Sequence, residues 1–313
     1  MIFLISRHHL TNASCRTGFS LRYKPAANAS VSPKEYRFAM LSETFSLLSQ
    51  EAYLTRSSLL TGFTHLRKAN IGDDTKGLFY SSFFQLSIGF ERLMKLILVV
   101  DYMAKNDLKP MTDEELRNKY SHKIKNLYKG CMSLASDQGM SLDEFVTENE
   151  FDYEIVSFLH EFALSARYYN LSKLSNSQKS KDPLSEWWSI LSIIMSSDVP
   201  YRKRKKIEEE SVRICDAIGN NTFTMMRGLD QQLMTTLDTI VYPQFIEAAS
   251  PYVVWRTFRV IKPLYSLIDR VVDEVHVIEQ QKGHDYPLVP YLYEFFPFLL
   301  LDRGSVIRRK KWG

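Results

Sequence analysis

The stretch Phe79–Val100, FYSSFFQLSIGFERLMKLILVV, decides the fold class of this chain. Its apolar side chains recur at alternating spacings of four and three residues: Phe79, Phe83, Leu86, Phe90, Leu93, Ile97 and Val100. That repeat places them on one side of an α-helix, as in a helix that is buried against other helices. Apolar residues on its other faces (Phe84, Ile88 and Leu96) predict that the helix lies centrally.

Helical patterns continue on both sides of this stretch. An earlier helix is expected from about residue 33 to residue 68. Gly72 and the two aspartates after it interrupt the pattern beyond that point. A capping box, Thr112–Glu115, predicts the start of a third helix that continues to Leu134. A fourth helix is expected over roughly residues 141–169. We therefore predict an all-α fold, an up-and-down helical bundle over residues 32–171.

The second half of the chain is less regular. Residues 172–184 are rich in Ser, Lys and Asn and are expected to form a linker. Residues 185–313 are expected to form an additional helical C-terminal region of unknown role. Helices are predicted around residues 187–195, 202–213, 225–242 and 256–281. Tyr252–Val260 also has the β-branched and aromatic content of a strand, but we favour helix.

The N-terminal segment, residues 1–31, shows no clear period and is expected to be a poorly ordered leader. Met40 opens a more regular stretch, so residues 1–39 are open to two interpretations, as leader or as part of the functional protein. Ser32–Glu35 favours the second, because it has the sequence of a capping box with proline at the first helical position.

The composition limits the class of protein. Apolar residues make up 45% of 313 residues, enough for a sizeable core, and the net charge is only +4. Nucleic-acid binding would therefore depend on local basic patches. Three widely spaced cysteines predict a reducing compartment, the cytoplasm, and no metal or cofactor is predicted from their spacing. The most apolar run contains Lys95, which makes a membrane span unlikely by composition.

One segment has residues suited to chemistry on RNA: Leu116–Tyr128, LRNKYSHKIKNLY. His122 titrates near physiological pH and can transfer a proton. Arg117 carries a permanent charge and a planar set of donors for a phosphate, and Asn118 can orient a phosphate oxygen or a hydroxyl. On a continuous helix Asn118 and His122 lie one turn apart on the same face. These three residues are the candidate catalytic group.

The same segment carries a basic patch. Four lysines in and around the predicted helix are candidate RNA-binding residues: Lys119, Lys123, Lys125 and Lys129. Their positive charges would attract the phosphate backbone close to His122.

Three segments, GFERLMK (Gly89–Lys95), the Leu116–Tyr128 segment and ARYYNL (Ala166–Leu171), resemble the HEPN superfamily (higher eukaryotes and prokaryotes nucleotide-binding) over roughly residues 42–170. The resemblance implies a four- or five-helix bundle that forms a homodimer near the motif. It implies metal-independent endoribonuclease activity of the RNxxxH type, as in bacterial toxin and antiphage defence proteins, with an antitoxin or regulatory protein as a partner.

The Arg–x4-6–His spacing also occurs at Arg270–His276. We reject that match because Val271 follows the arginine, where active members of the superfamily usually have Asn, Asp or His. Two alternatives to the nuclease stay open. In the first, the chain is a non-catalytic module that binds RNA or a nucleotide. In the second, it is a helical protein-interaction protein that acts through its aromatic C-terminal half.

Other polar groups are expected to be structural. Glu91 and Lys95 are predicted to form an ordinary i,i+4 ion pair. His160 is predicted to be a structural histidine. The cations of residues 202–206 precede three glutamates, so we favour a solvated charged helix face there over an RNA contact.

Overall fold

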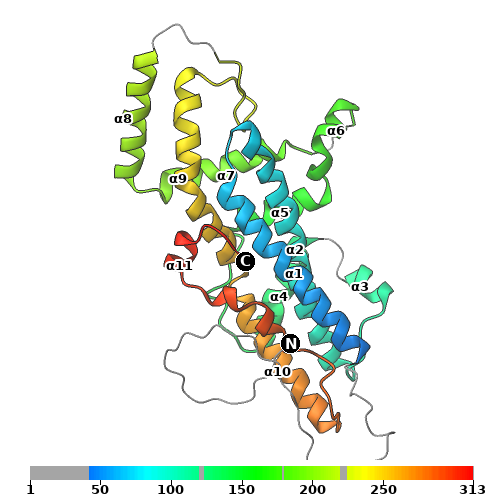
Figure 1. The fold of residues 1–313 in the computed structure, drawn as a ribbon. Helices are drawn as coiled ribbons and strands as arrows, with labels where there is room; N and C mark the ends of the chain where they lie inside the picture. Colours follow the sequence, from blue (N-terminus) through cyan, green and yellow to red (C-terminus); the bar gives the residue numbers. More distant parts are fainter. Residues whose placement is uncertain (1–41, 120–122, 178–179, 219–223, 313) are drawn as a thin grey trace, which may run out of the picture. The chain divides into compact units, whose positions relative to one another are not determined.

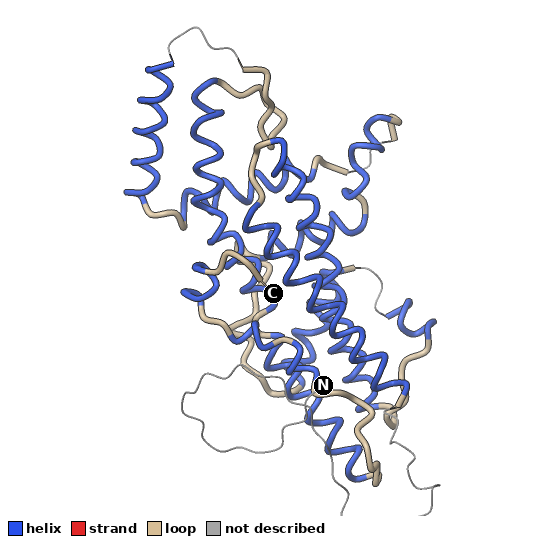
Figure 2. Tube along the Cα trace, viewed as in Figure 1, coloured by secondary structure: helices blue, strands red, loops and turns tan. Residues whose placement is uncertain are grey.

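The computed structural model describes residues 42–119, 123–177, 180–218 and 224–312, and these residues form an all-α fold, as predicted (Figure 1). Within these ranges, the extended pairing is limited to an isolated bridge between Arg227 and Leu233 (Figure 2). The expected leader, Met40 and the Ser32–Glu35 cap lie outside the described residues. The α-helices are α1 (Glu43–Lys68), α2 (Asp73–Lys105), α3 (Asp113–Lys119), α4 (Ile124–Asp137), α5 (Tyr153–Leu164), α6 (Tyr169–Leu174), α7 (Pro183–Ser197), α8 (Tyr201–Ile218), α9 (Thr236–Ile261), α10 (Leu264–Gln281) and α11 (Arg303–Arg308). Short 3-10 helices are η1 (Ala166–Tyr168), η2 (Leu292–Phe295) and η3 (Pro297–Leu300).

The antiparallel pair α1 and α2 forms the centre of the fold. All seven apolar positions of the repeat in α2 are buried, which confirms the prediction from Phe79–Val100. The two helices approach closely at two glycines. A Cβ atom on Gly62 would lie 2.7 Å from the side chain of Leu86, and a Cβ on Gly89 would lie 2.7 Å from the side chain of Leu59. Each leucine therefore occupies the space that a side chain on the facing glycine would need.

Helix α2 lies centrally, but its other faces are covered unequally. Leu96 is buried, but Phe84 is 37% and Ile88 41% exposed. Both line a shallow groove beside Phe162 and Leu164 of α5. The repeat determines which face of a helix is buried most deeply, but it does not determine whether neighbouring elements cover the flanks.

Two helix predictions need correction next to α2. The single helix expected from residue 112 to Leu134 is divided, because Lys123 is not helical and α4 begins at Ile124. The two parts have separate anchors: α3 is tied to α2 by a hydrogen bond from Tyr102 to Glu115, whereas α4 packs on α2 and α5. The expected helix over residues 141–169 is also shorter, since α5 begins at Tyr153 after a series of turns.

Helix boundaries in the C-terminal half also differ from the prediction. The stretch expected at 225–242 becomes helical only at Thr236, where a capping box with Asp238 starts α9. This helix continues through Pro243 and Pro251. Proline has no N–H to donate, but the Ser250 hydroxyl donates to the carbonyl oxygen of Glu247, four residues before Pro251. Residues 252–260 are helical, as favoured.

The helix expected over residues 256–281 is divided into α9 and α10 at Pro263, whose missing N–H coincides with the start of α10. The region expected to be a linker contains the C-terminal part of α6 and the first two residues of α7.

The C-terminal helices share one core with the N-terminal ones. Helix α9 packs on α1, and α10 packs on α2. Arg256 bonds to Asp152 (2.6 Å) and Asp198 (2.5 Å), and Arg259 bonds to Asp152 (2.7 Å). Asp152 is almost fully buried, so its charge needs these arginines. The network fixes the starting point of α5, the helix that faces the candidate site.

Candidate nucleic-acid interface

The candidate site begins where α2 ends. Leu108 has a φ of 62°, in the left-handed region, and its side chain is buried, which anchors the turn. The capping box predicted for the next helix is present. The backbone N–H of Thr112 donates to the Glu115 carboxylate (2.9 Å), and the N–H of Glu115 donates to the Thr112 hydroxyl (3.3 Å). The same carboxylate accepts from Tyr102, which raises the pKa of the tyrosine. This joint holds α3 to the end of α2.

Helix α3 presents two of the three predicted catalytic residues. Arg117 and Asn118 lie in its last turn and their side chains are exposed. Figure 1 shows α3 standing out from the rest of the bundle. Their exposure makes both side chains accessible to a large polyanion such as RNA.

The third predicted catalytic residue, His122, lies outside the described residues, which resume at Lys123. The structure places Arg117 and Asn118 together on α3. That His122 shares a helix face with Asn118 stays a prediction.

The lysines predicted to bind RNA have different surroundings. Lys119 is the last residue of α3, and Lys123 is the exposed N-cap residue of α4. Lys125 is half-buried in the first turn of α4. Lys129 pairs with Glu148 at 2.7 Å, which raises the pKa of the lysine and lowers that of the glutamate. Lys129 would have to exchange this carboxylate for a phosphate in order to bind RNA.

His160 on α5 belongs to the same neighbourhood, although the sequence indicated only a structural role. Burial lowers its pKa, and the charges of Lys125 and Lys123 lower it further. Its Nδ1 atom is buried, and within the described part of the chain it has no hydrogen-bond partner. His160 therefore lies within the electrostatic influence of the cations at the start of α4. Its position in an apolar helix gave no sequence signal for this proximity.

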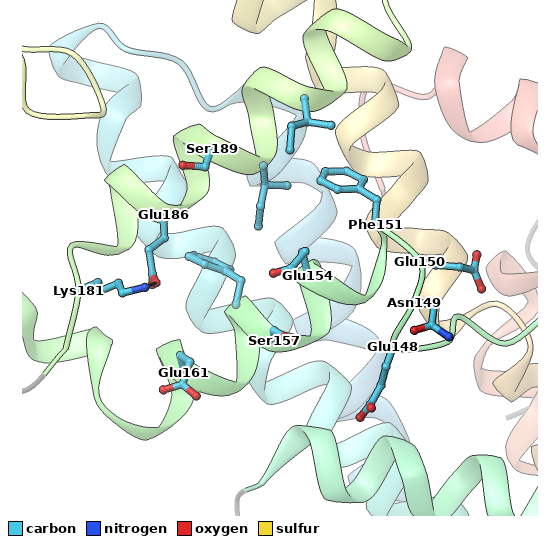
Figure 3. A pocket seen from close by; sticks show the side chains of 13 residues that line it. Glu148, Asn149, Glu150, Phe151, Glu154, Ser157, Glu161, Lys181, Glu186 and Ser189 are labelled. Carbon is cyan, nitrogen blue, oxygen red and sulfur yellow. Dashed lines mark ion pairs between the residues drawn. The ribbon is translucent and has the colours of Figure 1, made fainter.

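The opposite side of α5 is acidic. A cavity of about 590 Å³ lies between α5 and α7 and is lined by glutamates 148, 150, 154, 161 and 186 together with Lys181 (Figure 3). Burial raises the pKa of Glu186, the most enclosed of these acids for which a shift is resolved. None of the predicted site residues that the structure describes lines this cavity. Its negative charge would repel RNA, so RNA would approach the candidate site from the side of α3 and the start of α4.

The second Arg–x4-6–His match has a structural role. Arg270 of α10 donates to the backbone oxygen of Gln138 (2.8 Å). His276 is buried, and its Nε2 lies 2.9 Å from the carbonyl oxygen of Val289. A carbonyl oxygen can only accept, so this nitrogen carries the proton. Both side chains hold α10 to neighbouring segments of backbone.

No group of His, Cys, Asp or Glu side chains among the described residues is arranged to hold a metal ion. Within the same residues, every helix is too short or too polar to cross a membrane. Comparison of the chain with protein-family models, curated proteins and solved structures gives no match.

Proposed function

We propose that this chain is a HEPN-type, metal-independent endoribonuclease that acts as a cytoplasmic homodimer under the control of a regulatory protein. One observation carries the proposal. Arg117 and Asn118 are exposed on a capped helix, five and four residues before His122, and cationic residues follow at the start of α4.

The proposed reaction needs only groups from this segment and the RNA. His122 accepts the proton of a ribose 2′-hydroxyl as its oxygen attacks the neighbouring phosphorus. The bond from phosphorus to the 5′-oxygen then breaks, which leaves a 2′,3′-cyclic phosphate and a 5′-hydroxyl. Arg117 stabilises the negative charge that builds on the phosphate oxygens, and Asn118 orients the phosphate. A proton from the same imidazolium or from water completes the leaving group.

Charge on the surface determines how RNA approaches in this proposal. Lys123 and Lys125 attract the phosphate backbone from the α4 side, and the acidic cavity between α5 and α7 repels it from the other. The strand therefore lies across α3 and the first turn of α4. Glu148, which pairs with Lys129, marks the border between the two surfaces.

The test compares RNA cleavage by the purified full chain with cleavage by the His122→Ala and Arg117→Ala variants, in buffer with EDTA. We expect each variant to be slower by about 100-fold or more, because it lacks the proton-transfer group or the charge-stabilising group. Lys109→Ala is the matched control, since Lys109 is an exposed cation on the connection between α2 and α3, outside the motif. Equal rates for all four proteins, or loss of cleavage with EDTA, would contradict the proposal.

The cations at the start of α4 favour a second candidate, a module that binds RNA without cutting it. Lys123 is exposed and Lys125 is half-buried there, and both can bind phosphate without any proton transfer. This candidate predicts RNA binding that weakens with salt and with the Lys123→Ala and Lys125→Ala changes, and no cleavage products. The two candidates differ in whether products form while RNA is bound.

A further inference from the structure

Helix α8 has an outer surface that its structural role does not explain. It packs chiefly against α9, and only Ile207 and Ser211 are buried among its eighteen residues. Figure 1 shows it at the edge of the molecule, on the outer side of α9. Its first turns carry five consecutive cations, Arg202–Lys206, and four of these are exposed. The first two turns of α8 thus present a dense positive surface.

These cations are not neutralised by strong ion pairs. Lys205 and Lys206 face Glu209 and Glu210 at 3.7 Å, and both lysines are more than half exposed. Such contacts are weak and are screened by salt. Within the described part of the chain, no ion pair holds Arg202 or Lys203. Most of the positive charge of α8 is therefore available to a partner in solution.

The order of charges along α8 disfavours the helix itself. The cations lie at the N-terminus, where the helix dipole is positive, and the glutamates follow one turn later. Pairs with lysine four residues before glutamate are also the less favourable orientation. A helix selected only for stability would have the reverse order. An anion bound at the first turns would be attracted by both the side chains and the dipole.

We propose that the outer face of α8 binds the phosphate backbone of RNA. This proposal extends the proposed function, because it adds a second contact surface for the same substrate. A row of phosphates is complementary to consecutive cations on a helix. A membrane surface fits less well, because only Tyr201 precedes the cations, and the other exposed apolar residues of α8 (Val212, Ile214 and Ile218) lie beyond them along the axis. Helices that lie in a membrane surface have an apolar face along their whole length.

The surface implies binding with a defined salt dependence. Each phosphate neutralised on single-stranded RNA adds about 0.7 to the slope of log K against log salt. Loss of three or four contacts should therefore reduce the slope by about 2–3. The affinity should fall at least tenfold at low salt.

The experiment uses the full chain carrying His122→Ala, so that any cleavage of the RNA is suppressed. Fluorescence anisotropy gives the affinity for a labelled single-stranded RNA at several salt concentrations. The R202Q/K203Q/K205Q/K206Q variant should bind at least tenfold more weakly at low salt, and its slope of log K against log salt should be smaller by about 2–3. The R303Q/R308Q/K310Q/K311Q variant has the same change in charge at the exposed cations of the C-terminal segment, and it should bind like the parent.

The outcomes separate this inference from the proposed function. Three results would overturn the role of α8. They are no RNA binding by the parent, unchanged binding by the α8 variant, and an equal loss of affinity in both variants. Binding to vesicles of anionic phospholipid, with none to RNA, would overturn it in favour of a membrane. If the wild-type chain cuts no RNA but the α8 variant alone loses affinity and slope, the nuclease proposal fails and the α8 surface stands.

Discussion

His160 is half-buried on α5, and its titration should affect the stability of the fold. Burial lowers its pKa below the ordinary value of 6.5. In the unfolded chain it takes up a proton as the pH falls below 6.5, whereas in the native state it remains neutral until a lower pH. The unfolded state then binds more protons than the native state. The free energy of unfolding therefore decreases as the pH is lowered through this window. We expect His160→Gln to reduce this loss, as measured by urea denaturation at a series of pH values.

His284→Gln provides the control, because His284 is exposed near the end of α10. It should leave the pH profile of stability as in the wild type. A profile for His160→Gln that follows the wild type below pH 6.5 would mean that this histidine is solvated and charged in the native state.

At the level of helices, the crossing of α1 and α2 gives a prediction with an internal control. Gly62→Ala or Gly89→Ala would place a methyl group 2.7 Å from a leucine side chain, so the helices must move apart. We expect a loss of about 1–3 kcal/mol, the usual cost of overpacking. Gly77→Ala, in the exposed first turns of α2, meets nothing within 4 Å. It should instead stabilise the protein by up to about 1 kcal/mol, because alanine favours a helix more than glycine.

Chemical denaturation of the three variants measures these effects. Equal stability changes at Gly62 and Gly77 would mean that the close approach of α1 and α2 is absent in solution.

The same helices show what the sequence can predict. The apolar repeat of α2 identified its buried face at all seven positions, because period and burial are local properties of a helix. The Thr112–Glu115 cap and the Glu91–Lys95 ion pair (2.7 Å) were also predictable, since their partners are three or four residues apart. Whether a helix continues or is interrupted was not predictable. It depends on contacts with residues far away in the sequence, such as the hydrogen bond of 2.6 Å from Arg67 to Ser250, the residue before Pro251.

The candidate site divides in the same way. The exposure of Arg117 and Asn118 agrees with the polar segment around them. The pairing of Lys129 with Glu148 and the closeness of His160 to Lys125 depend on how α4 packs against α5. Contacts of that kind follow from tertiary packing, and one sequence contains no local signal for them.

For the whole molecule, Trp312 connects the end of the described chain to its beginning. Its ring packs on Phe63 of α1 and Phe258 of α9, and its backbone N–H donates to the hydroxyl of Thr64 (3.0 Å). We expect Trp312→Ala to lower the free energy of unfolding by about 3 kcal/mol, as for other large aromatic truncations in a core. Lys310→Ala, two residues earlier and exposed, should change it by less than about 0.5 kcal/mol.

Urea denaturation followed by circular dichroism measures both variants. Equal midpoints for Trp312→Ala and the wild type would show that the core closes without this side chain. The same packing predicts that a chain cut after Pro183 loses α9 and α10 from the core, so such a truncation cannot separate binding from folding.

The contact between Thr64 and Trp312 spans 248 residues, and this separation matters during synthesis. The α1–α2 pair is formed from neighbouring sequence and can assemble early, while the ring of Phe63 has no cover from Trp312. At ordinary elongation rates the ribosome needs about 10–50 s to add the intervening residues. For that time the nascent chain presents an apolar surface to the cell, and chaperones that hold such surfaces would have their main opportunity to bind it there.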